Sequence, residues 1–300
     1  MKVLITGGSG LVGSRLTELL TAKGIEVVWL SRKAGIRNGI VSYEWSYKKK
    51  NIDPEAFNGV THIIHLAGAG VFDKRWTDEY KKEIIDSRIE TTKLLFEHIE
   101  SMDLVSSFIS GSAIGWYGNR MDDKRMVESD APGSDFLANV TKQWEAAADV
   151  FTTKGIRTVK IRIGIVLAKE GGALPAMLAP VKLSIGSPLA SGKQMVAWIH
   201  IDDLCGIFMK ALEDTSMQGV YNGVAPNPLP NALFMRTCAD VIKKPFFMPR
   251  VPALILELIL GKEKAMSLIQ GINVSSEKVE AKGYAFKFRD LAAALKDILD

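Results

Sequence analysis

The chain has 300 residues, of which 47% are hydrophobic, and it carries 38 basic and 34 acidic side chains for a formal net charge of +4. This length accommodates one large α/β domain or two smaller ones, and the apolar content suffices for a full core, which excludes a disordered protein. The basic residues are scattered, so the composition indicates neither a nucleic-acid partner nor an anionic membrane partner.

The chain opens on a short apolar strand that runs into three glycines spaced three residues apart, Gly7, Gly10 and Gly13. We expect Gly7 to take a positive φ, Gly10 to let a pyrophosphate approach, and Gly13 to let the next helix pack close to the strand. That helix, predicted from residue 11 to 23, points its free N–H groups at the phosphates. A second apolar run at 25–30 completes a βαβ unit, which favours a dinucleotide site over a ligand-free turn.

The end of the second predicted strand indicates which dinucleotide is bound. An NAD site places a carboxylate there for the ribose 2′-hydroxyl, whereas an NADP site places a cation there for the 2′-phosphate. This chain has Ser31-Arg32-Lys33. Arg32 can give planar, charge-assisted hydrogen bonds to a phosphate, with Ser31 as a further donor. NADP(H) is therefore the predicted cofactor; a solvated basic turn, the alternative, leaves the missing carboxylate unexplained.

Strands and helices alternate through the first half of the chain, as in a doubly wound parallel sheet. Further strands are predicted at 60–66, 104–110 and 159–166, and helices at 77–101 and 136–153. Beyond about residue 167 the alternation ends, with a strand at 195–201, a helix that Asp202 caps and that runs to residue 212, a strand at 219–224 and then mostly helix. The predicted fold class is α/β, Rossmann-like, with a smaller, mostly helical C-terminal part.

This pattern predicts two domains. An NAD(P)-binding Rossmann-like domain is expected over residues 1–225, with a substrate-loop insertion at about 167–195, and a substrate-side domain over 226–300. The apolar run at 251–260 is too short to span a bilayer, so we expect a helix that is buried or that lines a ligand or subunit contact. No membrane partner is expected.

The two cysteines and the N-terminal residues indicate in which cellular compartment the protein is expected. Cys205 and Cys238 lie in apolar segments and are expected to be buried hydrophobes, so neither a disulfide framework nor a metal site is predicted. The first strand begins at residue 2, which leaves no room for a targeting peptide, and a cytoplasmic location is expected.

Several ordered motifs resemble the extended short-chain dehydrogenase/reductase superfamily, which includes nucleotide-sugar epimerases. They are Thr6-Gly7-x-x-Gly10-x-x-Gly13, His65-Leu66-Ala67-Gly68 and Trp198-Ile199-His200-Ile201-Asp202-Asp203. Others look like an atypical branch of it, the epimerase family: Arg75-Trp76-Thr77, Tyr80-Lys81, Ser87-Arg88-Ile89-Glu90-Thr91-Thr92, Gly171-Gly172-Ala173-Leu174-Pro175 and Asn222-Gly223-Val224-Ala225-Pro226-Asn227-Pro228. The resemblance covers nearly the whole chain, including a small C-terminal domain from about residue 249.

The resemblance implies a set of NADP(H) contacts. These are Gly7, Gly10, Leu11 and Val12 at the pyrophosphate, Ser31 and Arg32 at the 2′-phosphate, Leu66, Ala67 and Gly68 along the adenosine and ribose, Glu83 and Arg88 as further contacts, and Val166 beside the nicotinamide. Glu83 and Arg88 have the alternative of a helix-surface ion pair, but a spacing of five residues is poor for one.

The family's catalytic pattern is incomplete in this chain. The resemblance implies a Tyr-x-x-x-Lys helix, and Lys142 fits the lysine, yet Ala138 stands at the tyrosine position. Ser112 is the candidate for the carbonyl-polarising serine and Tyr117 for a phenol supplied from a neighbouring loop. Alternatively, Tyr117 is an aromatic side chain packed into a turn, and Lys142 is a solvated lysine on the surface of the helix.

His200 and Asp202 are candidates for a catalytic dyad. The His-x-Asp-Asp pattern, however, more often forms a junction between a strand and a helix, at which an aspartate is the N-cap.

Two functions remain open at this stage. The first is an NADP-dependent oxidoreductase or nucleoside-diphosphate-sugar epimerase-like enzyme that transfers hydride to or from an unidentified small substrate. The second is a non-catalytic NADP(H)-binding redox sensor, which the alanine at position 138 favours. A nucleic-acid-binding role lacks a basic and aromatic patch. The helices at 77–101 and 136–153 occupy positions that form dimer bundles in similar proteins, so a homodimer is a further expectation.

Overall fold

A computed structural model describes residues 1–98 and 104–300, and by its contacts the chain divides into two units. The first unit holds residues 1–113, 139–161 and 205–221, and the second holds 114–138, 162–204 and 222–300. Each unit has its own hydrophobic core, with Leu4, Ile63 and Phe108 buried in the first and Trp198 and Phe234 in the second.

A nine-stranded sheet within the described residues has the order β13-β9-β7-β6-β1-β2-β4-β3, with β5 paired to β4. Its strands are β1 Lys2–Thr6, β2 Glu26–Ser31, β3 Gly35–Arg37, β4 Ile40–Ser46, β5 Asn51–Ile52, β6 His62–His65, β7 Ser107–Ala113, β9 Arg157–Ile163 and β13 Gly219–Gly223. The β7-β6-β1-β2-β4 ladder is parallel throughout, which confirms the predicted Rossmann-like class. The carboxyl ends of these strands therefore meet along one edge, where such sheets bind ligands.

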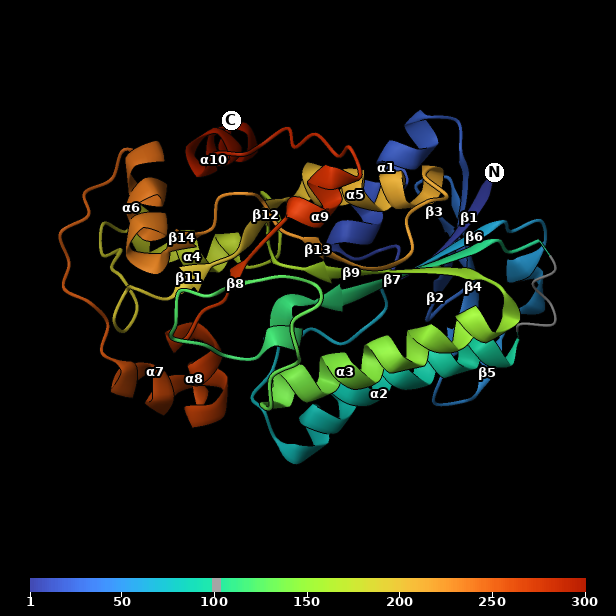
Figure 1. Cartoon of the computed structure of the whole chain (residues 1–300), viewed down its shortest axis with the longest axis horizontal. Helices are drawn as coiled ribbons and strands as arrows, with labels where there is room; N and C mark the ends of the chain where they lie inside the picture. The colour runs from blue at the N-terminus through green and yellow to red at the C-terminus, as the bar shows by residue number, and fades with distance from the viewer. Residues whose placement is uncertain (99–103) are drawn as a thin grey trace. The chain divides into compact units, whose positions relative to one another are not determined.

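The helices that alternate with these strands along the chain are α1 Leu11–Ala22, α2 Asp78–Glu97, α3 Phe136–Asp149 and α5 Ile201–Glu213, with 3₁₀ turns η1 Pro54–Phe57, η3 Ile114–Tyr117 and η4 Val150–Lys154. Helices α2 and α3 run side by side in Figure 1, and the Arg88 guanidinium lies 5.0 Å from the ring centre of Trp144. The predicted end of the first of these helices, at Ser101, lies outside the described residues.

Two of the predicted strands are divided in the structure. The strand expected at 159–166 ends at Ile163, and β10 Ile165–Leu167 pairs instead with β12 Trp198–His200. Gly164 lies between the two strands, where the backbone of Ala197 approaches so closely that a Cβ would lie 2.6 Å from its carbonyl oxygen. The strand expected at 195–201 is likewise divided, into β11 Met195–Val196 and β12. Strand β4 was not predicted.

The second unit contains more helix than strand. Its remaining elements are β8 Arg125–Met126, α4 Leu174–Lys182, β14 Leu229–Pro230, α6 Asn231–Val241, α7 Ala253–Leu260, α8 Lys262–Ile269, β15 Asn273–Val274, α9 Glu277–Ala281 and α10 Leu291–Leu299. The apolar run at 251–260 forms α7 as a helix, but Leu254, Leu258 and Ile259 are 65%, 73% and 70% exposed, so the helix is not buried within the protein. Among the described residues, no helix combines the length and apolar character needed to cross a membrane.

Candidate functional site

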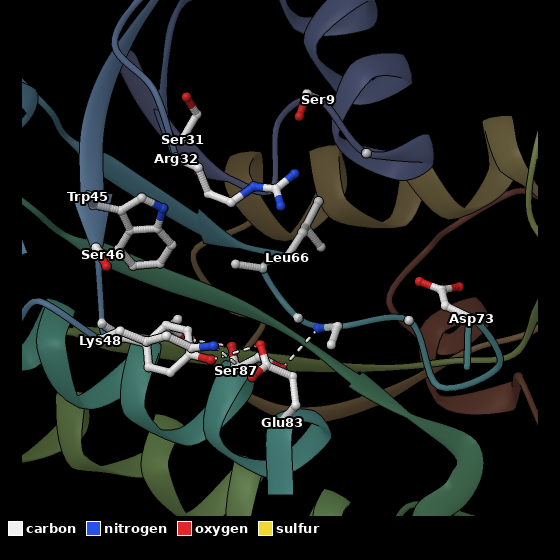
Figure 2. A pocket seen from close by; sticks show the side chains of 18 of the residues that line it. Ser9, Ser31, Arg32, Trp45, Ser46, Lys48, Leu66, Asp73, Glu83 and Ser87 are labelled. Carbon is white, nitrogen blue, oxygen red and sulfur yellow. Dashed lines mark hydrogen bonds and ion pairs between the residues drawn. The ribbon is translucent and has the colours of Figure 1, made fainter. Parts of the chain in front are cut away.

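A pocket of ≈ 990 Å³ lies in the first unit, and every residue lining it belongs to that unit (Figure 2). Its walls come from the segments that follow β1, β2, β4 and β6 and from one face of α2. The lining residues are Gly7, Ser9, Gly10, Leu30, Ser31, Arg32, Trp45, Ser46, Tyr47, Lys48, Leu66, Ala67, Gly68, Ala69, Gly70, Asp73, Lys74, Thr77, Glu79, Tyr80, Glu83, Ser87 and Thr91. The pocket thus occupies the predicted ligand edge of the sheet.

The glycine turn has the backbone that a pyrophosphate cradle requires. Gly7 has φ +70°, and a Cβ on Gly13 would lie 2.3 Å from the Gly7 carbonyl oxygen, which confirms both expectations. Gly10 is the N-cap of α1 and lines the pocket, and the first turn of α1 carries no acidic side chain. The helix N-terminus therefore keeps N–H groups and a positive dipole end for an anion. These features fit a dinucleotide pyrophosphate.

A buried polar network fixes the loop after β6. Thr6 Oγ1 accepts hydrogen bonds from the backbone N–H groups of Leu66 and Ala67, each at 3.1 Å, and lies 2.8 Å from Nδ1 of His65. The His65 side chain is fully buried, and this burial lowers its pKa to about 3. The neutral imidazole fixes the loop that forms one wall of the pocket.

The predicted phosphate-binding residues lie at the end of β2. The exposed Arg32 side chain reaches into the pocket between Ser9 and Leu66 (Figure 2). Ser31 Oγ donates to the Lys33 carbonyl oxygen at 2.5 Å, so this hydroxyl shapes the turn after the strand. Ser9 lines the same end and was missed by the sequence reasoning, although its place between Gly7 and Gly10 was a usable signal.

Glu83 and Arg88 take separate partners rather than each other. Glu83 lines the pocket, where Oε1 accepts from the Tyr47 hydroxyl at 2.9 Å and Oε2 accepts from Lys48 Nζ at 3.0 Å. Burial raises the pKa of Glu83, but these hydrogen bonds outweigh it and hold the pKa below its usual value. The carboxylate is thus an ionised hydrogen-bond acceptor at neutral pH.

Arg88 lies beneath the loop after β6. Its Nη1 donates to the Ile84 carbonyl oxygen at 2.9 Å, and a Cβ on Gly68 would come within 3.1 Å of its Cζ. Burial lowers the pKa of Arg88 to about 10, which leaves it charged at neutral pH. A buried cation in this position supports the wall of the pocket and adds positive potential to it.

Ser112, at the end of β7, is paired with a residue that the sequence reasoning did not single out. Its hydroxyl donates to Oε1 of Glu145 on α3 at 2.7 Å, and both side chains are buried. Thr141 and Ala138 are buried as well, whereas Lys142 is exposed. The structure therefore brings Ser112 to Glu145 and leaves Lys142 on the exposed side of the helix.

Tyr117 lies in the second unit and is 1% exposed. Its hydroxyl donates to Oδ1 of Asn222 at 2.7 Å and accepts from Nη1 of Arg162 at 3.1 Å. The same guanidinium lies 4.0 Å from the ring centre of Trp116. Burial raises the pKa of Tyr117 to about 12 even though Arg162 opposes the shift, so the phenol is protonated across the neutral range.

The expected aspartate cap on α5 is wrong, because the cap comes from the histidine before it. Helix α5 begins at Ile201, and Nδ1 of the buried His200 accepts from the Asp202 N–H at 3.0 Å. Asp203 accepts from the backbone N–H groups of Lys287 and Phe288 at 2.8 and 2.9 Å. These side chains fasten a strand-to-helix junction and the segment before α10, so the predicted junction is present and the residue that caps it differs.

The remaining predicted residues are placed as follows. Leu11 and Val12 form the first turn of α1, and Val166 lies in β10 of the second unit. Their nucleotide contacts stay predictions. Cys205 and Cys238 are both buried, as expected, and burial raises the pKa of Cys238 to about 12.

Comparison with known proteins gives two family matches. The NAD dependent epimerase/dehydratase family matches residues 3–222, and a domain of unknown function, DUF1731, matches residues 251–298. The human epimerase family protein SDR39U1 is 35% identical over 304 residues, with complete coverage of both chains. An Arabidopsis thaliana chloroplastic homologue of that protein is 33% identical over all of this chain and 87% of its own length.

Solved structures agree with these matches. The crystal structure of human SDR39U1 (isoform2) with NADPH has a TM-score of 0.88 and 34% identity, and covers 99% of each chain. A Thermus thermophilus UDP-glucose 4-epimerase in complex with NAD has a TM-score of 0.79 at 20% identity and covers 100% of this chain and 98% of its own. At that identity the second likeness concerns the fold alone.

Proposed function

The chain belongs to the NAD dependent epimerase/dehydratase family, and on that premise we propose that it binds NADP(H) in the pocket of its first unit and acts as an oxidoreductase or epimerase-like enzyme on a small substrate. The observation that carries this proposal is the joint placement of Arg32 and the Gly7–Gly10 turn in one pocket. NADPH in the human relative of 34% identity supports it.

Different residues along the pocket would hold different parts of the cofactor. The N-terminus of α1 would hold the pyrophosphate, because its N–H groups face an anion without a competing carboxylate in the first turn. Arg32 would hold the 2′-phosphate, since a guanidinium pairs with a phosphate through two parallel hydrogen bonds. The loop from Leu66 to Gly68, fixed by Thr6 and His65, would support the adenosine and its ribose.

The nicotinamide supplies the hydride chemistry when the cofactor is bound. Ser112 is our candidate for the group that polarises a substrate carbonyl, because Glu145 fixes its hydroxyl at the end of β7. Tyr117 and Lys142 remain the candidates for a proton donor and a ribose contact.

A second candidate, an NADP(H)-binding redox sensor, is favoured by one observation. Ala138 stands at the position of the usual acid/base tyrosine, and Lys142 is exposed. A screen of carbonyl compounds and nucleotide sugars for NADPH oxidation distinguishes the two candidates. Turnover of any substrate supports the enzyme, and binding of NADPH without turnover across the screen supports the sensor.

A cytoplasmic location completes the proposal. Within the described residues Cys205 and Cys238 form no disulfide and both are buried, which fits a reducing compartment.

A further inference from the structure

A hydrogen-bond donor and an acceptor lie side by side in the part of the pocket that follows β4. Lys48 Nζ and Glu83 Oε2 are 3.0 Å apart, and both residues line the pocket (Figure 2). Tyr47 donates to the other oxygen of Glu83 at 2.9 Å and so fixes the orientation of the carboxylate. Burial and then the hydrogen bond to Glu83 raise the pKa of Tyr47, so its hydroxyl keeps its proton for this bond.

The order of the strands decides which part of a nucleotide reaches this pair. The pyrophosphate cradle follows β1 and Arg32 follows β2, while β4 is the next strand outward. A nucleotide with its phosphates at the first two positions extends its base toward the third. Trp45, at the end of β4, and Leu66, in the loop after β6, both line the pocket and offer apolar surface to the faces of a planar base.

We propose that Lys48 and Glu83 read the edge of the adenine base. The exocyclic amino group of adenine donates to Glu83, and the adjacent ring nitrogen N1 accepts from Lys48. This inference rests on the proposed function, because it requires the nucleotide to lie in this pocket.

The chemistry of the pair selects adenine over a close relative. An ionised carboxylate only accepts hydrogen bonds, and an ammonium group only donates them. Hypoxanthine has the same shape, but it carries an acceptor oxygen in place of the amino group and a donor N–H in place of N1. In the pose of adenine, both contacts would then set acceptor against acceptor and donor against donor, which a site built on hydrogen bonds rejects. Tyr47 holds the Glu83 carboxylate against the shift that would exchange the two contacts.

The exposure of the Lys48–Glu83 ion pair argues against a mainly structural role for it. The Lys48 and Glu83 side chains are 67% and 37% exposed, and a pair that exposed contributes little to stability. The contribution of these two groups is therefore expected in binding.

The test compares NADPH with its hypoxanthine counterpart, nicotinamide hypoxanthine dinucleotide phosphate in the reduced form, by calorimetric titration of the full chain. We expect the hypoxanthine form to bind about tenfold or more weakly. In Glu83→Gln, whose amide can turn to donate or accept, and in Lys48→Met the two dissociation constants should differ by threefold or less.

Two matched variants serve as controls. Glu90 lies on the same helix as Glu83 and pairs with Lys93 at 2.8 Å, and Lys49 follows Lys48 and lies 3.9 Å from Glu44. Neither lines the pocket. Glu90→Gln and Lys49→Met should both retain the full preference for adenine.

The comparison in the unmodified protein requires no variant to fold. Equal affinities there would overturn the base-reading role of Lys48 and Glu83 while leaving NADP(H) binding intact. Failure to bind either nucleotide would overturn the proposed function and this inference together.

Discussion

Thr6 and His65 share a hydrogen bond of 2.8 Å between Oγ1 and Nδ1, and it fixes the tautomer of the histidine. Thr6 Oγ1 already accepts two backbone N–H groups, so its own proton points to Nδ1. Thr92 gives its proton to the Arg88 carbonyl oxygen at 2.6 Å, and so accepts from Nε2 at 3.1 Å. The imidazole is therefore neutral, with its proton on Nε2.

This arrangement predicts a pH dependence of stability. The pKa of His65 is about 3 in the folded chain and about 6.5 when the chain unfolds. Between these values the unfolded chain binds the extra proton, so the free energy of unfolding should fall as the pH drops from 6.5 toward 3. One group contributes a slope of about 1.4 kcal/mol per pH unit. Urea unfolding at pH 7.5, 6, 5 and 4 measures it.

The control for that prediction is His65→Gln, which removes the titrating ring. This variant should be less stable at pH 7.5, by about 1–3 kcal/mol for the partners left unsatisfied. Its stability should also vary less between pH 6 and pH 4 than that of the unmodified chain. Identical slopes for the two proteins would show that His65 does not titrate on unfolding.

The glycine turn predicts a loss of binding without a loss of fold. Gly10 has φ −80°, which valine tolerates, but the position lines the pocket at the N-terminus of α1. Gly10→Val should abolish NADPH binding, because the branched side chain occupies the place of the pyrophosphate. Titration with NADPH and a far-UV circular dichroism spectrum check it. Unchanged affinity in a folded variant would place the phosphates elsewhere.

The Tyr117→Phe variant distinguishes a structural role of the Tyr117 hydroxyl from a role in proton transfer. In Tyr117→Phe, Asn222 and Arg162 lose the hydroxyl between them, which should cost about 1–3 kcal/mol of stability. NADPH affinity should not change, because the pocket lies in the other unit. Stability equal to that of the unmodified chain would contradict the buried network.

Turnover of Tyr117→Phe tests the remaining role once a substrate is found. A fall of about 10²-fold in a fully folded sample would assign proton transfer to the phenol. Unaltered turnover would remove it from the mechanism.

Local sequence predicted the glycine turn well, because Gly13 meets a steric demand from the nearby Gly7 and Gly8 backbone, and Gly7 takes the positive φ that a sharp turn after the strand needs. It also contained a strand that we did not predict, β4, where Val41, Tyr43 and Trp45 alternate with Ser42 and Glu44. This omission affected the predicted site, because Trp45 and the residues that follow it line the pocket.

Other features depend on packing that spacing does not reveal. The phase of α3 is set by the burial of Trp144 and Ala148, which leaves Lys142 exposed and brings Glu145 to Ser112. The cap on α5 could not be assigned from His-x-Asp-Asp either, because an imidazole and an aspartate can both accept the first free N–H groups of a helix.

Arg32 carries the predicted preference between the two nucleotides. Arg32→Ala should remove about 1.5–3 kcal/mol of NADPH binding, the range for a hydrogen bond to a charged group, and should leave NADH binding nearly unchanged. Arg37→Ala is the matched control, since Arg37 is an exposed arginine in β3 and does not line the pocket. An equal loss for both nucleotides in Arg32→Ala would mean that the residue does not contact the 2′-phosphate.

The affinity of the unmodified protein for NADPH and for NADH, measured by titration calorimetry under identical conditions, tests the central claim most directly. A 2′-phosphate held by Arg32 predicts that NADPH binds about tenfold or more tightly than NADH. Equal affinities for the two nucleotides, or tighter binding of NADH, would contradict the assignment of this pocket to NADP(H).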